Sequence, residues 1–422
     1  MSTQTPATSA APPSAAPRRQ LRLSPLTALL GLLALLGLLA FARLVTGTAD
    51  IASSGTLRAA LGAAVPIGLA GLGGLWAERA GVVNIGLEGM LILGTWGAGF
   101  AGYQWGPWAG VVAAVLCGAL GGLLHALATV TFAVDHIVSG VAINILGLGA
   151  TQYLSAVVFE GVSGGGSTQS PSIGDLPTVG VPGLDGALAG VESRGWFLIS
   201  DAAALLRAAT TGLSMLTLLA AALFVLTWFV LWRTAFGLRL RSCGESPAAA
   251  ESLGVDVYLH KYVAVVVSGA LAGLGGAYLA IVASSSYREG QTGGRGFIGL
   301  AAMIFGNWRP GGLAVGAGLF GYTDALQLRG GGASVHALLL VVGVVLLAAA
   351  ACQLRRGRAT RAAVVVGVGA LVLLWFFLTD VVPSDFTRMT PYVATLLVLA
   401  LAAQRLRMPA ADGRPYRRGE AE

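Results

Sequence analysis

The chain has 422 residues, of which 55% are hydrophobic, 11% are charged and 62 are glycine, and its formal net charge is +7. Soluble domains carry about 25% charged residues and about 7% glycine, so this composition excludes an ordinary soluble enzyme. The apolar residues form long uncharged runs, each near the ~20 residues with which a helix crosses ~30 Å of hydrocarbon. The sequence therefore predicts an all-α, polytopic transmembrane helical bundle.

Neither the positive charge nor the cysteines point to a nucleic-acid or metal site. In a membrane protein, a surplus of Lys and Arg is typical of basic cytoplasmic loops. Cys117, Cys243 and Cys352 lie far apart without the spacing of metal ligands, and the four histidines show no such spacing either. We expect no metal, no cofactor and no nucleic-acid partner.

The apolar runs follow one another along most of the chain. Residues 1–22 are rich in Ala, Pro, Ser and Thr and are predicted to form a disordered cytoplasmic tail. A first span at 23–42 is too long for the apolar part of a signal peptide. Further apolar segments lie at 57–77, 85–103, 108–132, 137–159, 209–232, 262–283, 313–328, 336–353, 362–380 and 391–405.

A shorter apolar stretch, Phe297–Trp308, reaches only about 18 Å as a helix and must be buried among other spans. Basic residues cluster at 233–261, 355–361 and 405–418, and such clusters belong in the cytoplasm. If the short stretch counts as one crossing, alternation places all three clusters and the N-terminus inside. This predicts about twelve crossings of the cell membrane, both termini cytoplasmic and the segment 160–204 outside.

Small residues indicate where helices come close. Glycines are spaced as GxxxG, a pattern typical of helix packing in membranes, at Gly118/Gly122, Gly269/Gly273 and Gly312/Gly316.

The loop 233–262 is longer than a simple turn and contains the signals of a short helix. Ser246 is placed to cap its start, Pro247 suits the first helical position, and Gly254 can end it in the left-handed conformation. Seven residues are too few for a stable helix in water. Either the loop is an ordinary solvated connection or, as we favour, the helix docks on a cytoplasmic partner.

At this point a family resemblance is clear. It is carried by Glu78–Met90 (ERAGVVNIGLEGM) and Gly294–Trp308 (GRGFIGLAAMIFGNW), and also by the loop just described and by Pro409–Tyr416 (PAADGRPY). The chain resembles permease subunits of the ABC transporters that import nucleosides and simple sugars, in the branched-chain amino acid and ribose permease superfamily. The resemblance implies that an ATPase contacts the loop at Glu245, Ser246, Pro247, Ala248, Ala249, Ala250, Glu251 and Gly254.

The resemblance also implies the rest of the assembly. It predicts an ABC ATPase subunit, a second and different permease subunit, an extracytoplasmic substrate-binding lipoprotein, and surrounding membrane lipid. Residues 23–330 then form the permease core, 331–387 an added pair of spans, and 388–422 a final span with a basic cytoplasmic tail. Nucleosides are favoured over simple sugars or other small solutes only by the resemblance of the first stretch.

Polar residues within the apolar runs are candidates for the translocation pathway, because such residues usually face the bundle interior or water. Asn84 and Glu88 are four residues apart and are expected on one helical face. Glu88 either pairs with Arg79, bonds a neighbouring helix or lines the path.

Asn144 and Gln152 are deeper candidates, because they lie within about 80° of one another on a helix. Each either lines the path or forms an interhelical hydrogen bond. Phe297 and Phe305 could stack on a nucleobase, since such stacking is worth ~1–3 kcal/mol, or they could simply pack.

An ion-coupled secondary transporter is the alternative class. It would need ionisable residues at mid-span or paired interrupted helices, whereas the carboxylates lie mostly near predicted span ends and one short segment has no partner. The sequence contains no GxxxxGK[ST] motif, so ATP hydrolysis is expected on a partner chain and not here.

Overall fold

The computed structural model describes residues 25–355, 357–387, 389–390, 393, 396 and 406–419. The predicted tail 1–22 and nearly all of the predicted final span 391–405 lie outside these residues. Every other predicted apolar segment coincides with a helix, and in the described part of the chain seven helices are long and apolar enough to cross a membrane. The predicted helical membrane protein is thereby confirmed in outline.

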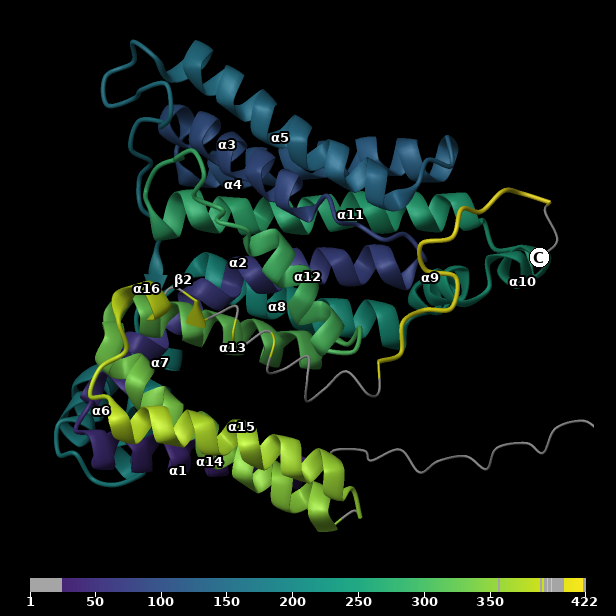
Figure 1. Ribbon diagram of the computed structural model, residues 1–422. Helices are drawn as coiled ribbons and strands as arrows, with labels where there is room; N and C mark the ends of the chain where they lie inside the picture. The colour runs from purple at the N-terminus through teal and green to yellow at the C-terminus, as the bar shows by residue number, and fades with distance from the viewer. Residues whose placement is uncertain are drawn as a thin grey trace, which may run out of the picture.

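The long helices run roughly side by side (Figure 1). They are α1 (Pro25–Thr46), α2 (Ser54–Arg79), α3 (Leu87–Trp105), α4 (Pro107–Ala126), α5 (His136–Phe159), α8 (Met215–Arg233), α11 (Val257–Ala277), α13 (Pro310–Arg329), α14 (Gly331–Arg355) and α15 (Ala359–Leu378). Short π-helical turns extend α4 and α11 as η2 (Leu127–Thr131) and η3 (Tyr278–Ala283).

The predicted short segment is the helix α12 (Arg295–Phe305), which has 11 residues. It packs against α2, α13 and α3. Its short length is therefore compensated by burial among longer helices, as expected for a backbone that cannot face lipid at its ends.

At one end of the molecule, the segment predicted to lie outside contains helices. It folds into α6 (Leu184–Glu192) and α7 (Ile199–Thr210), which the sequence reading missed. Arg207 joins them through ion pairs with Asp185 and Glu192, at 2.8 Å and 3.0 Å. The same end carries η1 (Ala49–Ile51), α16 (Ser384–Thr387), and the antiparallel strands β1 (Thr178–Val179) and β2 (Leu213–Ser214).

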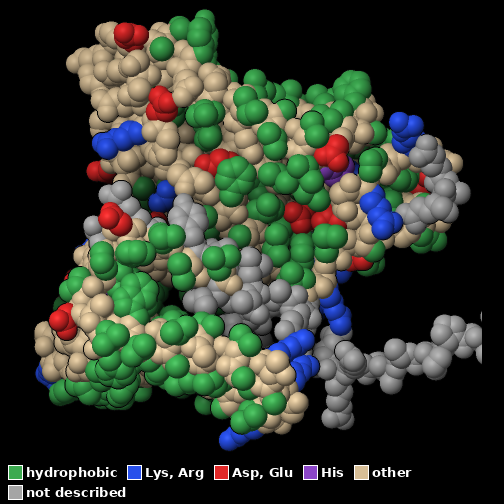
Figure 2. Space-filling model, viewed as in Figure 1, with side chains coloured by type: hydrophobic (Ala, Val, Ile, Leu, Met, Phe, Trp, Pro, Cys, Tyr) green, Lys and Arg blue, Asp and Glu red, His purple; other side chains and the backbone are tan. Residues whose placement is uncertain are grey.

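The opposite end carries two helices of the predicted loop, α9 (Ala235–Glu245) and α10 (Pro247–Ser252), and the C-terminal residues 406–419. The turn between α14 and α15 lies at this end as well (Figure 1). Basic side chains occur here, whereas hydrophobic side chains cover much of the middle of the molecule (Figure 2). The three basic clusters recognised in the sequence thus gather at one end.

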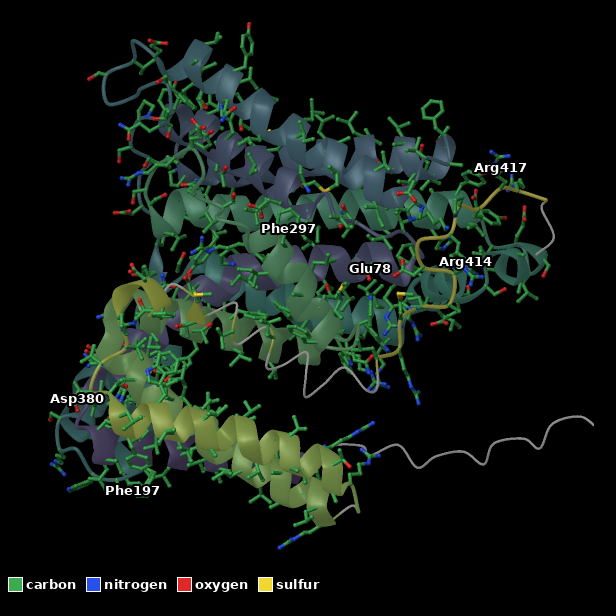
Figure 3. The ribbon with its side chains drawn as sticks, viewed as in Figure 1. Glu78, Phe197, Phe297, Asp380, Arg414 and Arg417 are labelled. Carbon is green, nitrogen blue, oxygen red and sulfur yellow. The ribbon has the colours of Figure 1, made fainter. Side chains whose placement is uncertain are left out.

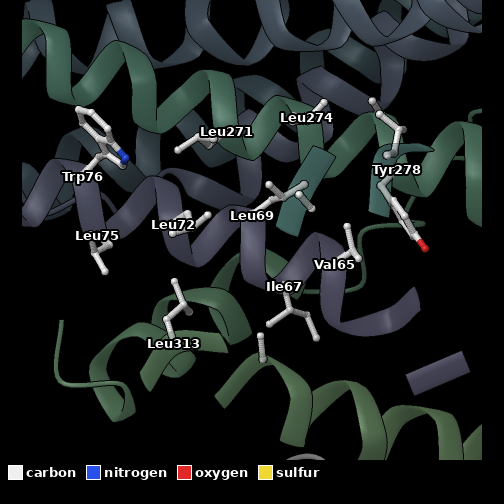
Figure 4. Packing of buried hydrophobic residues seen from close by; sticks show 14 of the residues in the cluster. Val65, Ile67, Leu69, Leu72, Leu75, Trp76, Leu271, Leu274, Tyr278 and Leu313 are labelled. Carbon is white, nitrogen blue, oxygen red and sulfur yellow. The ribbon is translucent and has the colours of Figure 1, made fainter. Parts of the chain in front are cut away.

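The core forms around α2, which contacts α11, α12 and α13. Ile67, Leu69, Leu72 and Leu75 on α2 are almost completely buried, together with Leu313 on α13 (Figure 4). A helix that is apolar all round, as this one is, belongs in the centre of a large bundle.

Glycines set the distance between α4 and α11. A Cβ at Gly118 would lie 2.3 Å from the Gly269 carbonyl oxygen, and one at Gly273 would lie 2.2 Å from the Ala114 oxygen. Real Cβ atoms do not approach this closely, so only glycine permits this backbone contact. The packing role predicted for these GxxxG pairs is confirmed.

Candidate functional site

The two stretches that carry the family resemblance lie against each other. Glu88 lies in the first turn of α3, and its side chain reaches the start of α12. Its two carboxylate oxygens accept hydrogen bonds from the backbone N–H groups of Gly294 and Gly296, at 2.9 Å and 2.7 Å. A carboxylate at a helix N-terminus satisfies unpaired N–H groups and interacts favourably with the helix dipole. Glu88 therefore bonds a neighbouring helix and does not pair with Arg79.

Trp308, at the end of the second stretch, binds the start of the first stretch. Its indole N–H donates to the buried carboxylate of Glu78, and its carbonyl oxygen accepts two bonds from the Arg79 guanidinium, at 3.0 Å and 2.7 Å. The first stretch thus holds α12 near both of its ends. The short helix α12 is thus fixed by polar bonds to its neighbours, which satisfy backbone groups that cannot face lipid.

The shared helical face predicted for Asn84 and Glu88 is wrong. Helix α3 begins at Leu87, so Asn84 lies in the turn before it, and Gly81 in that turn has a φ of +82° that ends α2. Asn84 is fully buried and donates to the Ser268 hydroxyl of α11 at 2.8 Å.

Asn144 of α5 reaches the turn that precedes α3. Its amide oxygen accepts the N–H of Gly89 at 2.7 Å, and its amide nitrogen donates to the Ile85 carbonyl at 3.0 Å. Gln152 is exposed and donates to Glu289, in the loop after α11. The structure therefore brings Asn144 to the segment that holds Asn84 and Glu88, but it does not bring Gln152 there.

The two phenylalanines of α12 have different surroundings. Phe297 is 46% exposed and lies between the two ends of the molecule (Figure 3). Phe305 is partly buried and its ring centroid lies 5.9 Å from that of Phe320 on α13. Of the two, only Phe297 presents a large open face.

The predicted short helix of the 233–262 loop is present as α10. Pro247 occupies its first turn, and Gly254, with a φ of +80°, follows its end. The expected side-chain cap from Ser246 is wrong, because its hydroxyl makes no capping bond and only its carbonyl accepts the Ala250 N–H, at 3.0 Å. The preceding helix α9 was not anticipated.

Only one side of α10 is buried. Pro247 and Ala250 face inward, and Ala250 packs with Cys243 and Val257. Burial raises the pKa of the Cys243 thiol to about 11, so this cysteine is a neutral packing group. Ala249 is exposed, and Leu253 just beyond the helix is 84% exposed.

The C-terminal residues 406–419 pack onto this loop. Tyr416 and Arg418 donate to the Glu251 carboxylate, and the bond from Tyr416 is the main cause of the lowered pKa of Glu251. Asp412 is buried near Glu78, and its burial raises its pKa to about 7. The sequence predicts this segment to be a basic cytoplasmic tail that carries part of the family resemblance, but a local pattern does not indicate where a tail docks.

Comparison with known proteins identifies the family. The family model described as the permease component of the branched-chain amino acid transport system matches residues 56–350. The chain belongs to this permease family. The matched region ends within α14 and so includes the loop 233–262 and both resemblance stretches.

Curated relatives of this permease cover most of its length. It is 33% identical over 371 residues to the guanosine ABC transporter permease protein NupQ of Bacillus subtilis, which covers 85% of this chain and 94% of the relative. It is 32% identical to the nucleoside ABC transporter permease protein NupC of Lactococcus lactis, over 83% of this chain and 93% of the relative.

A third relative is named for a different substrate. The putative glucose ABC transporter permease protein TsgC13 of Haloferax volcanii is 35% identical over 283 residues, which is 66% of this chain and 78% of the relative. No solved structure matches this chain. Family membership and the seven apolar helices make the chain a multi-pass transport protein of the cell membrane.

Proposed function

We propose that this chain is the membrane subunit of an ATP-driven importer of nucleosides. Nucleosides are proposed as the substrate because the chain matches two permeases named for guanosine and nucleosides, each over more than four fifths of its length. The match to a permease named for glucose covers less of it. Simple sugars are therefore the second choice.

Coupling to an ATPase is assigned to α10. One side of this helix packs on Cys243 and Val257, while Ala249 and Leu253 are exposed. Exposed apolar groups at a rigid, internally anchored helix suit insertion into a groove of a partner. The residues proposed to form this contact are Glu245, Ser246, Pro247, Ala248, Ala249, Ala250, Glu251 and Gly254.

The substitution Ala249→Asp tests this assignment. It places a charge on the exposed side of α10, so the protein should fold while capture of a co-expressed ATPase and solute uptake are lost. Ala359→Asp is the matched control, because Ala359 is also exposed, starts α15 and lies outside the loop. If Ala249→Asp reduces the yield of folded protein, Leu253→Ser gives the same test at a side chain outside the core. Unchanged ATPase capture in these variants would contradict the assignment.

The membrane topology is proposed as twelve crossings with both termini in the cytoplasm. It is supported by the gathering of the basic clusters at the end that carries α9 and α10, and by the position of α6 and α7 at the opposite end. In a variant without the native cysteines, a cysteine at Ser252 should react with a membrane-impermeant maleimide only in opened vesicles. A cysteine at Ser193 should react in intact cells, and the reverse pattern would overturn the topology.

A translocation pathway along α3, α5 and α12 is proposed from Asn84, Glu88, Asn144, Gln152, Phe297 and Phe305. The exposed ring of Phe297 is the best candidate for contact with a nucleobase, because stacking contributes ~1–3 kcal/mol per base. Phe297→Ala should then reduce uptake of nucleosides more strongly than Phe305→Ala, which should also lower stability because the Phe305 ring packs against Phe320.

Substrate and energy source are separated by one uptake experiment. Proteoliposomes that contain the permease, a co-expressed ATPase, a second permease subunit and a substrate-binding lipoprotein should take up labelled guanosine or uridine in an ATP-dependent manner. A preference for glucose would favour the second choice. Uptake by the chain alone that collapses with the proton gradient would indicate a secondary transporter and contradict the proposal.

The remaining partners are proposed from the same resemblance. A second, different permease subunit would complete the pathway, and the lipoprotein would deliver solute at the end with α6 and α7. Membrane lipid would cover α5, α8 and α15, whose apolar side chains are largely exposed. Co-purification of two distinct permease chains would support the heterodimer, and a functional homodimer would contradict it.

A further inference from the structure

The C-terminal residues 406–419 hold α10 from its exposed flank. The Glu251 carboxylate accepts hydrogen bonds from the Tyr416 hydroxyl, from Arg418 Nε at 3.1 Å and from the Gly419 N–H at 3.4 Å. Three donors from one segment thus converge on one side chain of a six-residue helix. Such a short helix needs support from outside itself, because helices of this length are unstable alone.

The same segment also contacts α9, the turn after α12, and α11. The Ala411 N–H donates to the Gly244 carbonyl at 2.9 Å, and the Arg407 N–H donates to the Asn307 side chain at 2.8 Å. The Tyr416 ring lies 5.6 Å from the buried Lys261 ammonium of α11. Figure 3 places Arg414 and Arg417 at the same end of the molecule as Glu78.

Asp412 is the innermost anchor. Only 8% of it is exposed, and it lies beside the Glu78 carboxyl group at the end of α2. Both of its carboxylate oxygens are buried and have no hydrogen-bond partner among the described residues. The segment therefore extends from Glu251 of α10 to the end of α2. There Glu78 also binds Trp308, which lies in the turn between α12 and α13.

We propose that residues 406–419 form a clasp that ties α10 to α2 and α11, so that a displacement of α10 is passed into the helix core through the clasp. Glu251, Tyr416 and Arg418 are then positioning residues of the coupling apparatus. In this arrangement the Glu251 carboxylate is held by the clasp. The inference rests on the proposed function of α10 as the ATPase contact.

The test uses Tyr416→Phe and Glu251→Gln in the full transporter, reconstituted with its ATPase. Tyr416→Phe keeps the ring and removes one hydroxyl donor. Because a hydrogen bond to a charged group corresponds to about a tenfold change in an equilibrium constant, we expect roughly a three- to tenfold fall in solute moved per ATP. ATPase capture should stay unchanged in Tyr416→Phe, because this side chain lies outside the proposed ATPase contact, and the double variant should be little worse than either single variant.

Tyr153→Phe is the matched control, because it removes the same hydroxyl from a 70% exposed tyrosine on α5. If Tyr416→Phe folds poorly, Arg418→Gln removes a bond to Glu251 from a side chain that is 67% exposed. A ratio of solute to ATP equal to that of Tyr153→Phe would overturn the clasp, as would a loss confined to ATPase capture. If Ala249→Asp also leaves ATPase capture intact, the fault lies with the proposed function of α10.

Discussion

The glycine-rich centre of this permease and the α14–α15 pair are both built from apolar helices, but they are held together differently. In the centre, 78% of the most apolar stretch of α11 is buried, against 17% for α15. The central helices touch backbone to backbone at glycines and are joined by buried polar side chains. The α14–α15 pair packs mainly on itself and beside α1 and α13. Apolarity alone therefore brings helices into the membrane, whereas close contact and polar bonds fix their mutual positions.

The largest expected effect comes from adding a methyl group at the contact between α4 and α11. In Gly273→Ala the new Cβ would lie 2.2 Å from the Ala114 oxygen and 3.0 Å from Gly118 Cα, so the helices must separate. Overpacking of this kind typically costs ~1–3 kcal/mol, and we expect a clearly lower melting temperature in detergent together with lost uptake.

Gly367→Ala on α15 is the matched control, because a Cβ there meets nothing within 4 Å. Replacing glycine in a helix by alanine should leave stability unchanged or raise it by up to ~1 kcal/mol. Equal melting temperatures for Gly273→Ala and Gly367→Ala would remove the distinction between the centre and the pair.

An intermediate effect is expected at Glu88. Glu88→Gln keeps the shape but removes the charge and one of the two acceptors at the start of α12, where the bonds measure 2.9 Å and 2.7 Å. A hydrogen bond to a charged group is worth about 1.5–3 kcal/mol, but the amide oxygen keeps one of the two bonds, so stability and uptake should both fall by less than in Gly273→Ala. Glu160→Gln, at an exposed site just after α5, should change neither, and thermal unfolding of the two variants in parallel provides the check.

The smallest effect is expected within the α14–α15 pair. His336 Nε2 bonds the Phe376 carbonyl at 3.0 Å, so His336→Leu removes one hydrogen bond, worth about 1 kcal/mol, and uptake should remain close to that of the parent protein. His125 contacts both the Ser139 hydroxyl, at 2.8 Å, and the Val83 carbonyl, at 3.0 Å. His125→Leu should therefore be the more damaging of the two. If His336→Leu reduced uptake more than His125→Leu does, the α14–α15 pair would have a direct role in transport.

Several of these features could be predicted before the structure. The helix at Pro247 was predicted from its proline and its terminal glycine, because these residues act within one turn. The short length of α12 was read from its apolar run. The predictions of a Ser246 cap and of a common helical face for Asn84 and Glu88 were wrong. Both depended on the backbone conformation just before a helix, which tertiary contacts decide.

What the sequence by itself determined is the class of the molecule: apolar runs of span length, one short run, glycine spacing and two family stretches are all local in the chain. The tertiary structure alone decided that Glu88 caps α12, that Asn144 meets the turn before α3, and that residues 406–419 reach α10. These contacts join residues 55 to 206 positions apart, and they carry no periodic signal because they depend on how whole helices pack.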